Sequence, residues 1–327
     1  MFSVLLDSLG AVFIVFAIIG AGLFVSWRKW VSFETAKAFP KIIINISFPA
    51  TIVYSLYNNF SQQQLMNAWL PLLIAFASMM LAFFLAKAAA WLLRIEKHRR
   101  GVFIVAFAFS NSSFIGFPVA RALFGDVGMP YAVFYFLAGH VTFWLLGNYA
   151  IVRDAEVING KTHQSSFGSS LKKLAQPPTL STIIMFVVIF AGIKLPDVIL
   201  TTAKYIGDLT TPLSLIFIGC MIYNMGFSGM KWEKGLAPVL VGRFVLVPLL
   251  CYGLCTLGLT LLTPEITADH LFMREVFVVQ IGLPAIMQTA ISAEMYGADT
   301  KFATKCVLYT TALSLITIPV NMLLLTV

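Results

Sequence analysis

Long apolar segments dominate this chain and restrict the folds open to it. Hydrophobic residues make up 59% of the 327 residues and charged residues 11%, and the mean hydropathy is +0.90. An apolar stretch of about 20 residues can cross the hydrocarbon core of a bilayer as a helix. We therefore expect an all-α polytopic membrane protein. The predicted spans are approximately Leu9–Val25, Lys37–Tyr57, Ala68–Leu92, Val102–Leu123, Pro130–Val152, Leu180–Leu195, Ile199–Met225, Ala237–Leu262, Val276–Tyr296 and Phe302–Leu325.

Positive charges are distributed unevenly over the connections between these spans. Most of the 22 Lys and Arg residues lie in the odd-numbered connections or at the span ends beside them. Because cytoplasmic loops are enriched in Lys and Arg, we expect those connections to be cytoplasmic and both termini to lie outside a cell (inner or plasma) membrane. The net charge of +8 is then mostly a topology signal, and no nucleic-acid partner is expected, because none of these loops is long enough to be a domain.

A polar stretch divides the chain between the fifth and sixth spans. Residues 153–178 contain Gly160, Gly168 and the pair Pro177-Pro178, a composition typical of a linker, here a cytoplasmic one. The linker separates a first half, residues 1–152, from a second half, residues 179–327. With five spans in each half, the second half would enter the membrane upside down, which predicts an inverted repeat if the halves are homologous.

Two copies of a Gly-x-Pro pattern interrupt the fourth and ninth spans. They are Gly116-Phe117-Pro118 and Gly282-Leu283-Pro284. Gly and Pro weaken the helical hydrogen-bond ladder, and freed backbone is tolerated in a bilayer only where protein or a water-filled cavity satisfies it. Matched interruptions in two halves point to the binding site of a secondary transporter. Pro49 and Pro212, in the second and seventh spans, are predicted to be a second matched pair of helix breaks.

The chemistry around these breaks suits an anion. Each break would leave a half-helix whose N-terminus carries unpaired N–H groups and about half a positive charge. Two such ends facing one cavity would bind a carboxylate. Pro118 and Pro284 would shape the site without touching the ligand. In the alternative, Asn111 only caps the bent backbone and the glutamines bond between helices. The candidate substrate-binding residues are Asn111, Ser112, Ser113, Gly116, Gln280, Gly282, Gln288 and Thr289.

Ionisable residues within the spans are few. His140 is a candidate for proton coupling, and Glu294 for a gate or coupling acid; the alternatives are a neutral interhelical histidine and a solvated helix end. Arg243 is expected to snorkel to the interface; the alternative is that it attracts anions electrostatically. The four cysteines lie in apolar spans and support neither a metal site nor a disulfide. No metal or cofactor is expected, and coupling to H⁺, to Na⁺ or to no ion stays open.

The residues around the breaks resemble the auxin efflux carrier family. The fourth span of that family is similar to Asn111–Pro118 together with Ala122–Gly125. Its ninth span is similar to Gly282-Leu283-Pro284 together with Ala293–Gly297. The family resemblance extends to two further segments, Asn45–Pro49 in the second span and Thr317–Pro319 near the end of the chain. The family includes plant auxin exporters and bacterial malate or malonate permeases. The bacterial permease type is the better match, because Ser112 and Ser113 stand where plant carriers have an Asn-Pro-Asn signature.

The resemblance implies a fold shared with bile-acid and sodium–proton transporters, in which the broken fourth and ninth spans cross. It implies a mobile core of spans three to five and eight to ten, and a scaffold of spans one, two, six and seven that also offers a homodimer contact. We therefore expect a secondary transporter, a permease or exporter, that carries a small organic anion, a mono- or dicarboxylate, across the lipid bilayer by alternating access. We do not expect an enzyme.

Other functions are less well supported. Gly226-Phe227-Ser228-Gly229 matches a short string of intramembrane serine proteases. A nucleophilic serine needs a base within hydrogen-bond reach, but Ser228 falls in a predicted cytoplasmic turn and His270 on the opposite side. A membrane receptor that binds a metabolite without transporting it is a further alternative, and the chain shows no appended signalling domain that would favour it. A channel could also use broken helices, but an inverted repeat with a midplane site fits alternating access better.

Overall fold

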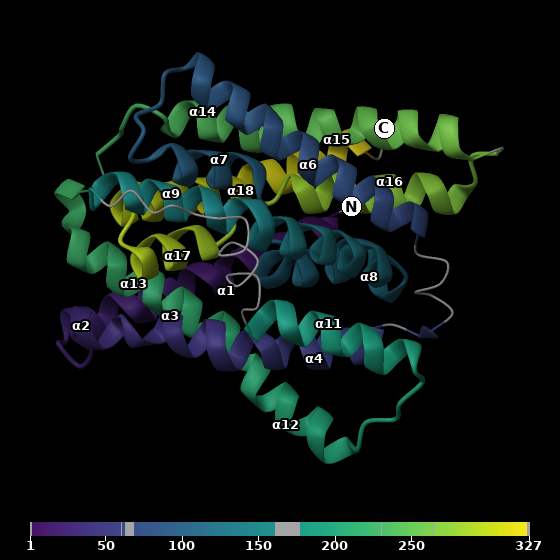
Figure 1. The fold of residues 1–327 in the computed structure, drawn as a ribbon, viewed down its shortest axis with the longest axis horizontal. Coiled ribbons are helices and arrows are strands. Elements are labelled where there is room, and N and C mark those ends of the chain that lie inside the picture. The colour runs from purple at the N-terminus through teal and green to yellow at the C-terminus, as the bar shows by residue number, and fades with distance from the viewer. Residues whose placement is uncertain are drawn as a thin grey trace. The chain divides into compact units, whose positions relative to one another are not determined.

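The computed structural model describes residues 2–59, 61–62, 69–160, 177–229, 231–263 and 265–325. In that part of the chain every regular element is helical (Figure 1). Contacts divide the chain into two compact units. Unit 1 is Met1–Ile14, Trp69–Lys161 and Lys231–Val327, and unit 2 is Val15–Ala68 and Thr162–Met230. Unit 1 thus contains spans three to five and eight to ten, which is the composition that the family resemblance implies for the core.

Unit 1 is built from both halves of the chain. α6 packs against α7, α8 and α15, and α16 packs against α8 and α15. A left-handed glycine, Gly125 with φ +64°, kinks α8. The helices of unit 1 are α6 (Trp69–Leu92), α7 (Arg100–Ala108), α8 (Phe117–Thr142), α9 (Asn148–Ile158), α14 (Leu236–Val241), α15 (Val247–Leu262), α16 (Ala268–Ile281), α17 (Gln288–Tyr296) and α18 (Thr300–Leu325), with the π-helical segments η2 (Ser112–Gly116), η3 (Phe143–Gly147) and η4 (Gly242–Leu246).

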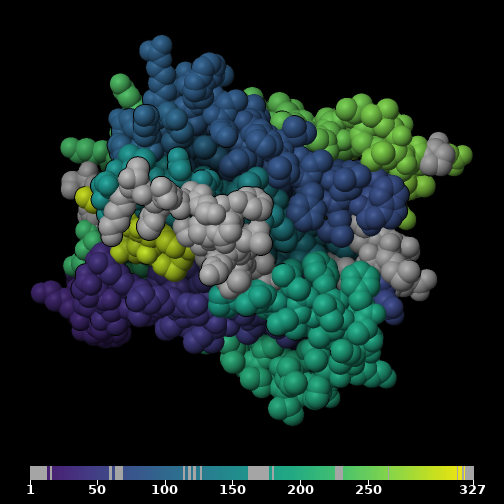
Figure 2. Space-filling model, viewed as in Figure 1, coloured from purple at the N-terminus to yellow at the C-terminus, as the bar shows by residue number. Residues whose placement is uncertain are grey.

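Unit 2 contains the second half of α1 (Phe2–Trp27), from Val15 onward. Its α4 packs against α11 and α12. α12 exposes Val198 and Tyr205 and forms the teal-green surface in the lower part of Figure 2. The other elements are α2 (Phe33–Ala36), α3 (Ala38–Ile42), η1 (Ile43–Ser47), α4 (Phe48–Asn59), α11 (Pro177–Phe190), α12 (Asp197–Asp208) and α13 (Thr210–Gly229).

Pro49 and Pro212 lie at helix boundaries of unit 2 rather than in unwound segments. Pro49 is the second residue of α4, which follows directly on η1. Pro212 lies in the first turn of α13, where a proline removes no intrahelical bond. Between them, the Thr51 hydroxyl lies 3.0 Å from the Gly207 carbonyl oxygen and 2.9 Å from the Thr210 hydroxyl. The two prolines therefore flank a polar contact between the second and seventh spans.

Several stretches have the length and surface of membrane helices. Large apolar side chains point outward from α6 and α15, including Leu81, Phe84, Leu257 and Leu261, which is unusual for a protein that faces water. The stretches long and apolar enough to cross a bilayer are Phe33–Asn58, Trp69–Leu92, Val127–Ile158, Asp197–Asn224 and Leu236–Leu262, with shorter apolar helices at Ala17–Trp27 and Leu180–Phe190. The full set of ten spans and the inverted repeat stay predictions.

The linker is shorter than predicted from composition. Residues 153–158 continue α9, and Pro177 begins α11; residues 161–176 lie outside the described part of the chain. Pro177 stands at the first position of its helix, which suits proline because the first N–H groups have no intrahelical acceptor. The sequence halves 1–152 and 179–327 each contribute to both compact units.

Two glycines allow α1 and α13 to approach closely in unit 2. A Cβ atom on Gly22 would lie 2.3 Å from the Ile216 carbonyl oxygen, and one on Gly219 would lie 2.2 Å from the Ile19 carbonyl oxygen. We predict that Gly22→Leu destabilises the protein by about 1–3 kcal/mol and lowers its melting temperature in detergent. Gly20→Leu, where no atom lies within 4 Å of the added Cβ, is the control. Equal melting temperatures for the two variants would refute this packing.

Candidate functional site

The fourth span is broken ahead of its Gly-x-Pro pattern. α7 ends at Ala108, Phe109 is extended with φ −101° and ψ 127°, and helical structure resumes at Ser112. Pro118 lies at the start of α8, a position that tolerates proline, and the π-helical η2 precedes it. The predicted break at Gly116–Pro118 therefore lies a few residues earlier, at Phe109–Asn111, because the wider π turn accommodates the proline without unwinding the helix there.

The ninth span is broken at the pattern itself. α16 ends at Ile281, and α17 begins at Gln288. The Gly282–Met287 stretch between them is not helical. Gly282 follows directly on the last residue of α16, and Pro284 stands where no helical hydrogen bond is needed.

The two breaks are hydrogen-bonded to each other within unit 1. The Asn111 N–H donates to the Pro284 carbonyl at 2.8 Å, and the Ile286 N–H donates to the Phe109 carbonyl at 3.0 Å. These bonds form an isolated antiparallel bridge between Ser110 and Ala285. They satisfy backbone groups that an interrupted membrane helix would otherwise leave unpaired. The fourth and ninth spans therefore meet at their breaks, and this meeting point is called the crossover.

Four helix ends meet at this crossover. The C-terminal ends of α7 and α16 approach it, and the N-terminal ends of η2 and α17 leave it. Helix N-termini carry partial positive charge and C-termini partial negative charge. The crossover therefore places fixed charge of both signs inside one unit.

A buried amide ties the two broken spans together beside the bridge. The Gln280 Nε2 atom donates to the Gly116 carbonyl at 2.9 Å, and the Gln280 side chain is 0% exposed. A Cβ atom on residue 116 would lie 2.3 Å from Gln280 Oε1. Glycine at this position is what allows the amide of α16 to reach the η2 backbone.

The structure gathers most of the predicted binding residues on the crossover segments. Asn111 is fully buried, and Gln288 and Thr289 form the buried first turn of α17. The Gln280 Oε1, Gln288 Oε1 and Thr289 Oγ1 atoms have no hydrogen-bond partner among the described residues. Ser112, Gly116 and Gly282 lie on the same segments, and the backbone places Ser113 in η2 and Pro118 in α8, although their side chains are outside the described part.

Arg243 does not snorkel, and that prediction was wrong. Its side chain is 0% exposed, and its Nη2 atom donates to the carbonyl of Ile281, the last residue of α16. Gly242 brings η4 against α7, because a Cβ atom there would lie 2.0 Å from the Phe107 ring. An arginine two turns inside an apolar span was the sequence signal for this role. The length of the arginine side chain, which can reach the interface from such a position, favoured the other role.

His140 and Glu294 lie outside the crossover segments. His140 is buried in the last turn of α8, with ring centroids 5.6 Å from Phe136 and 6.2 Å from Trp144. Glu294 is half-buried in the last turn of α17, close to Gly297, whose φ of +76° ends that helix. Their roles as coupling or gating groups stay predictions.

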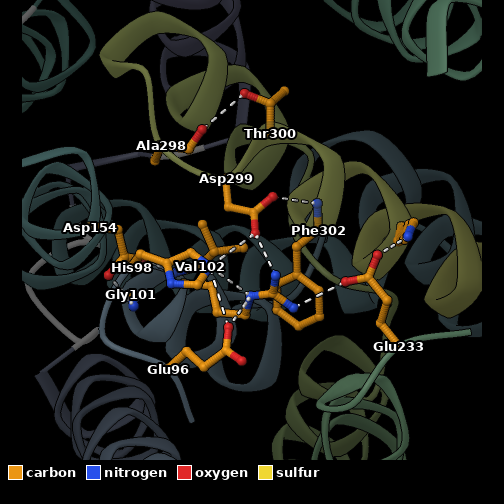
Figure 3. Close-up of polar contacts among 12 residues, drawn as sticks. Glu96, His98, Gly101, Val102, Asp154, Glu233, Ala298, Asp299, Thr300 and Phe302 are labelled. Carbon is orange, nitrogen blue, oxygen red and sulfur yellow. Dashed lines mark hydrogen bonds and ion pairs between the residues drawn. The ribbon is translucent and has the colours of Figure 1, made fainter. Parts of the chain in front are cut away.

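An ion-pair network joins the outer ends of the broken spans in unit 1 (Figure 3). Arg99, directly before α7, pairs with Glu233 at 3.0 Å and with Asp299 at 3.2 Å. Glu233, ahead of α14, also pairs with Lys305 of α18, which is 4% exposed. Asp299 lies between α17 and α18. Ion pairs of this network thus anchor α7 and α17 at the ends away from the crossover.

The N-terminus of α7 has its own carboxylate cap. Asp154 of α9 accepts the Gly101 and Val102 N–H groups at 2.8 Å each. Such a cap satisfies the first free donors of a helix and complements its dipole. Among the described residues, no group of three or more His, Cys, Asp or Glu side chains is placed to hold a metal ion.

Long apolar helices, and two broken helices that meet at their breaks, are typical of an integral membrane transporter. The chain belongs to the membrane transport protein family, which matches residues 7–322 and is the auxin efflux carrier family that the sequence resembles. It is 27% identical to an uncharacterized transporter of Methanocaldococcus jannaschii, over 87% of this chain and 88% of the relative. It is 25% identical to an uncharacterized transporter of Methanothermobacter thermautotrophicus, over 88% of each chain.

Proposed function

We propose that this protein is a secondary transporter of a small organic anion, a mono- or dicarboxylate, which binds at the crossover in unit 1. The observation that carries the proposal is the pair of hydrogen bonds that joins Asn111 to Pro284 and Ile286 to Phe109. These bonds hold the N-terminal ends of η2 and α17 on either side of the Ser110–Ala285 bridge. Two such ends provide partial positive charge for a carboxylate.

Buried polar side chains complement these helix ends. Asn111 and Gln288 carry amide groups that can donate to a carboxylate, and the Thr289 hydroxyl lies in the first turn of α17 without a partner among the described residues. An unsatisfied buried polar group is costly. A bound carboxylate would accept a hydrogen bond from the Thr289 hydroxyl and so supply the partner that this group lacks among the described residues.

Alternating access is the transport mode that best suits a site between discontinuous helices. By analogy with the family, unit 1 is the mobile core and unit 2 is the scaffold and homodimer contact. We place both termini outside the cell membrane and the linker in the cytoplasm, on the distribution of Lys and Arg. The proposal assigns no coupling ion.

Thermal stabilisation of the purified protein tests this site. A ligand that binds only the folded state raises its stability, by about 2.7 kcal/mol at a concentration 100 times Kd. We predict that small mono- or dicarboxylates raise the melting temperature and that Asn111→Ala weakens this binding at least about tenfold, because it removes a buried hydrogen-bonding group. Asn148→Ala is the control, since Asn148 is buried in unit 1 but bonds to the Tyr296 hydroxyl at 3.3 Å.

Two outcomes would contradict the proposal. The anion site is wrong if neutral or cationic solutes stabilise the protein while every carboxylate is silent. The transport assignment is wrong if a carboxylate binds but proteoliposomes show neither uptake nor exchange of it, which would favour a metabolite receptor.

A further inference from the structure

We propose that Arg243 is the counter-charge of the anion site. It provides a fixed positive charge beside the crossover that balances the bound anion, so that no inorganic cation has to bind with the substrate. This inference rests on the proposed function. It adds which residue sets the charge preference of the site, and it predicts that binding does not depend on sodium.

The guanidinium of Arg243 is buried without a compensating acid among the described residues. Its side chain is 0% exposed, its Nη2 atom donates to the Ile281 carbonyl, and its Nε and Nη1 atoms are buried without a hydrogen-bond partner in that part of the chain. A buried charge is costly unless it is paired. By contrast, the buried ammonium of Lys305 in the same unit pairs with the acid Glu233.

The position of the charge links it to the crossover. Ile281 is the last residue of α16, so its carbonyl belongs to the negative end of that half-helix dipole. The arginine offsets this negative end, while the positive ends of η2 and α17 remain available. The charge balance of the four helix ends is thereby shifted toward binding an anion.

Close packing holds Arg243 in this place. Neighbouring Gly242 lies so close to Phe107 that a Cβ atom would be 2.0 Å from the ring, which keeps η4 against α7. An arginine stays protonated at any physiological pH and donates from several nitrogens in a fixed plane. In an interior of low dielectric constant its charge acts over several ångströms, so the guanidinium does not have to touch the substrate.

The same charge disfavours a metal cation at the crossover. Hard cations require several oxygen ligands, usually with carboxylates among them. The crossover segments Phe109–Gly116 and Ile281–Thr289 contain no Asp or Glu, and a guanidinium beside them repels a second cation. Arg243 is therefore a specificity-determining and positioning residue that takes the place of a co-bound ion.

Binding of malonate, malonamate and malonamide tests the inference. These ligands are similar in size and carry about two, one and no negative charges at pH 7. We expect the wild-type protein to prefer malonate over malonamide by at least about tenfold, and this preference to fall to about threefold or less in Arg243→Gln. We expect wild-type affinity to change less than about twofold when choline replaces sodium. A purely structural role would weaken all three ligands alike and leave their ratio unchanged.

Arg274→Gln is the matched control. Arg274 lies in α16 of the same unit, with its guanidinium 4.6 Å from the centroid of the Tyr252 ring and away from the break. Its variant should keep the preference for malonate. If Arg243→Gln does not fold, Arg243→Lys decides: it keeps the charge, so it should keep both the ligand order and the indifference to sodium.

Three results would overturn the inference. An unchanged malonate-to-malonamide ratio in folded Arg243→Gln would remove Arg243 from the site and leave the proposed anion transport standing. Wild-type or Arg243→Lys binding that requires sodium would show that an inorganic cation, not the arginine, balances the charge. Wild-type protein that binds no anion of the series and no other carboxylate would defeat the proposed function and this inference together.

Discussion

Replacing Gly242 with alanine should reduce transport by at least about tenfold and lower the melting temperature. The added Cβ atom would lie 2.0, 2.3 and 2.3 Å from three atoms of the Phe107 ring. That ring is 1% exposed and rigid, so η4 or α7 has to move. Overpacking of this kind costs about 1–3 kcal/mol. The displacement would act on the segment that carries Arg243 and on the half-helix that leads to the crossover.

A second substitution should restore part of the loss. Phe107→Leu frees space on the opposite side of the contact, so the double variant should be less impaired than the sum of the two single variants. Gly258→Ala is the control in the same span, because its Cβ atom would meet Ile74 at an ordinary 3.5 Å. Strictly additive losses in the double variant would show that the Gly242–Phe107 contact does not position this region.

The two broken spans show what local sequence signals can and cannot predict. The ninth break coincides with Gly282 and Pro284, because these residues stand at and just after a helix end. The fourth break, at Phe109–Asn111, contains neither Gly nor Pro. Its unwound backbone is stabilised by hydrogen bonds to residues far away in the sequence, Pro284 and Ile286. Tertiary pairing of this kind leaves no local signal, so the pattern could predict that the span breaks but not where.

Arg243 illustrates a different limit. The predicted span begins at Ala237, so Arg243 lies about 9 Å inside it at 1.5 Å per residue. Arg243 therefore lies deeper than the first turn of the span, yet long arginine side chains often reach the interface from such positions. The contact that decides between the two roles is the one with Ile281, which belongs to another span. Composition predicted an unusual charge, and only packing revealed its partner.

The polar residues of the breaks were easier to predict than the ionisable ones. Asn111, Gln288 and Thr289 lie on the crossover segments and Gln280 lies directly before one of them, because all four flank the interruptions in sequence. His140 could not be placed in this way. Its burial follows from aromatic neighbours one turn away on each side, Phe136 and Trp144, and a lone histidine in an apolar span fits either a coupling group or a packed ring.

Glu233→Gln should destabilise unit 1 by about 2–3 kcal/mol, because it leaves the buried ammonium of Lys305 without its carboxylate. The Lys305 side chain is 5% exposed and that of Glu233 30% exposed, and Glu233 also pairs with Arg99. Partial exposure of the acid keeps the expected loss below that of a fully buried pair. Glu233→Gln removes the ion pairs of Glu233 with Arg99 and Lys305, whereas the pair of Arg99 with Asp299 is retained.

The matched control is an exposed pair of the same type. Glu34→Gln removes the ion pair of Glu34 with Lys37, in which the Glu34 side chain is 80% exposed and the Lys37 side chain 39% exposed. Such surface pairs typically contribute less than about 1 kcal/mol to the free energy of unfolding. Combining Glu233→Gln with Lys305→Met removes both charges and should recover stability relative to Glu233→Gln alone. Because the network anchors the outer ends of α7 and α17, transport should fall with stability in Glu233→Gln and recover in the double variant. Melting temperatures that do not distinguish Glu233→Gln from Glu34→Gln would mean that the network does not hold these half-helices in place.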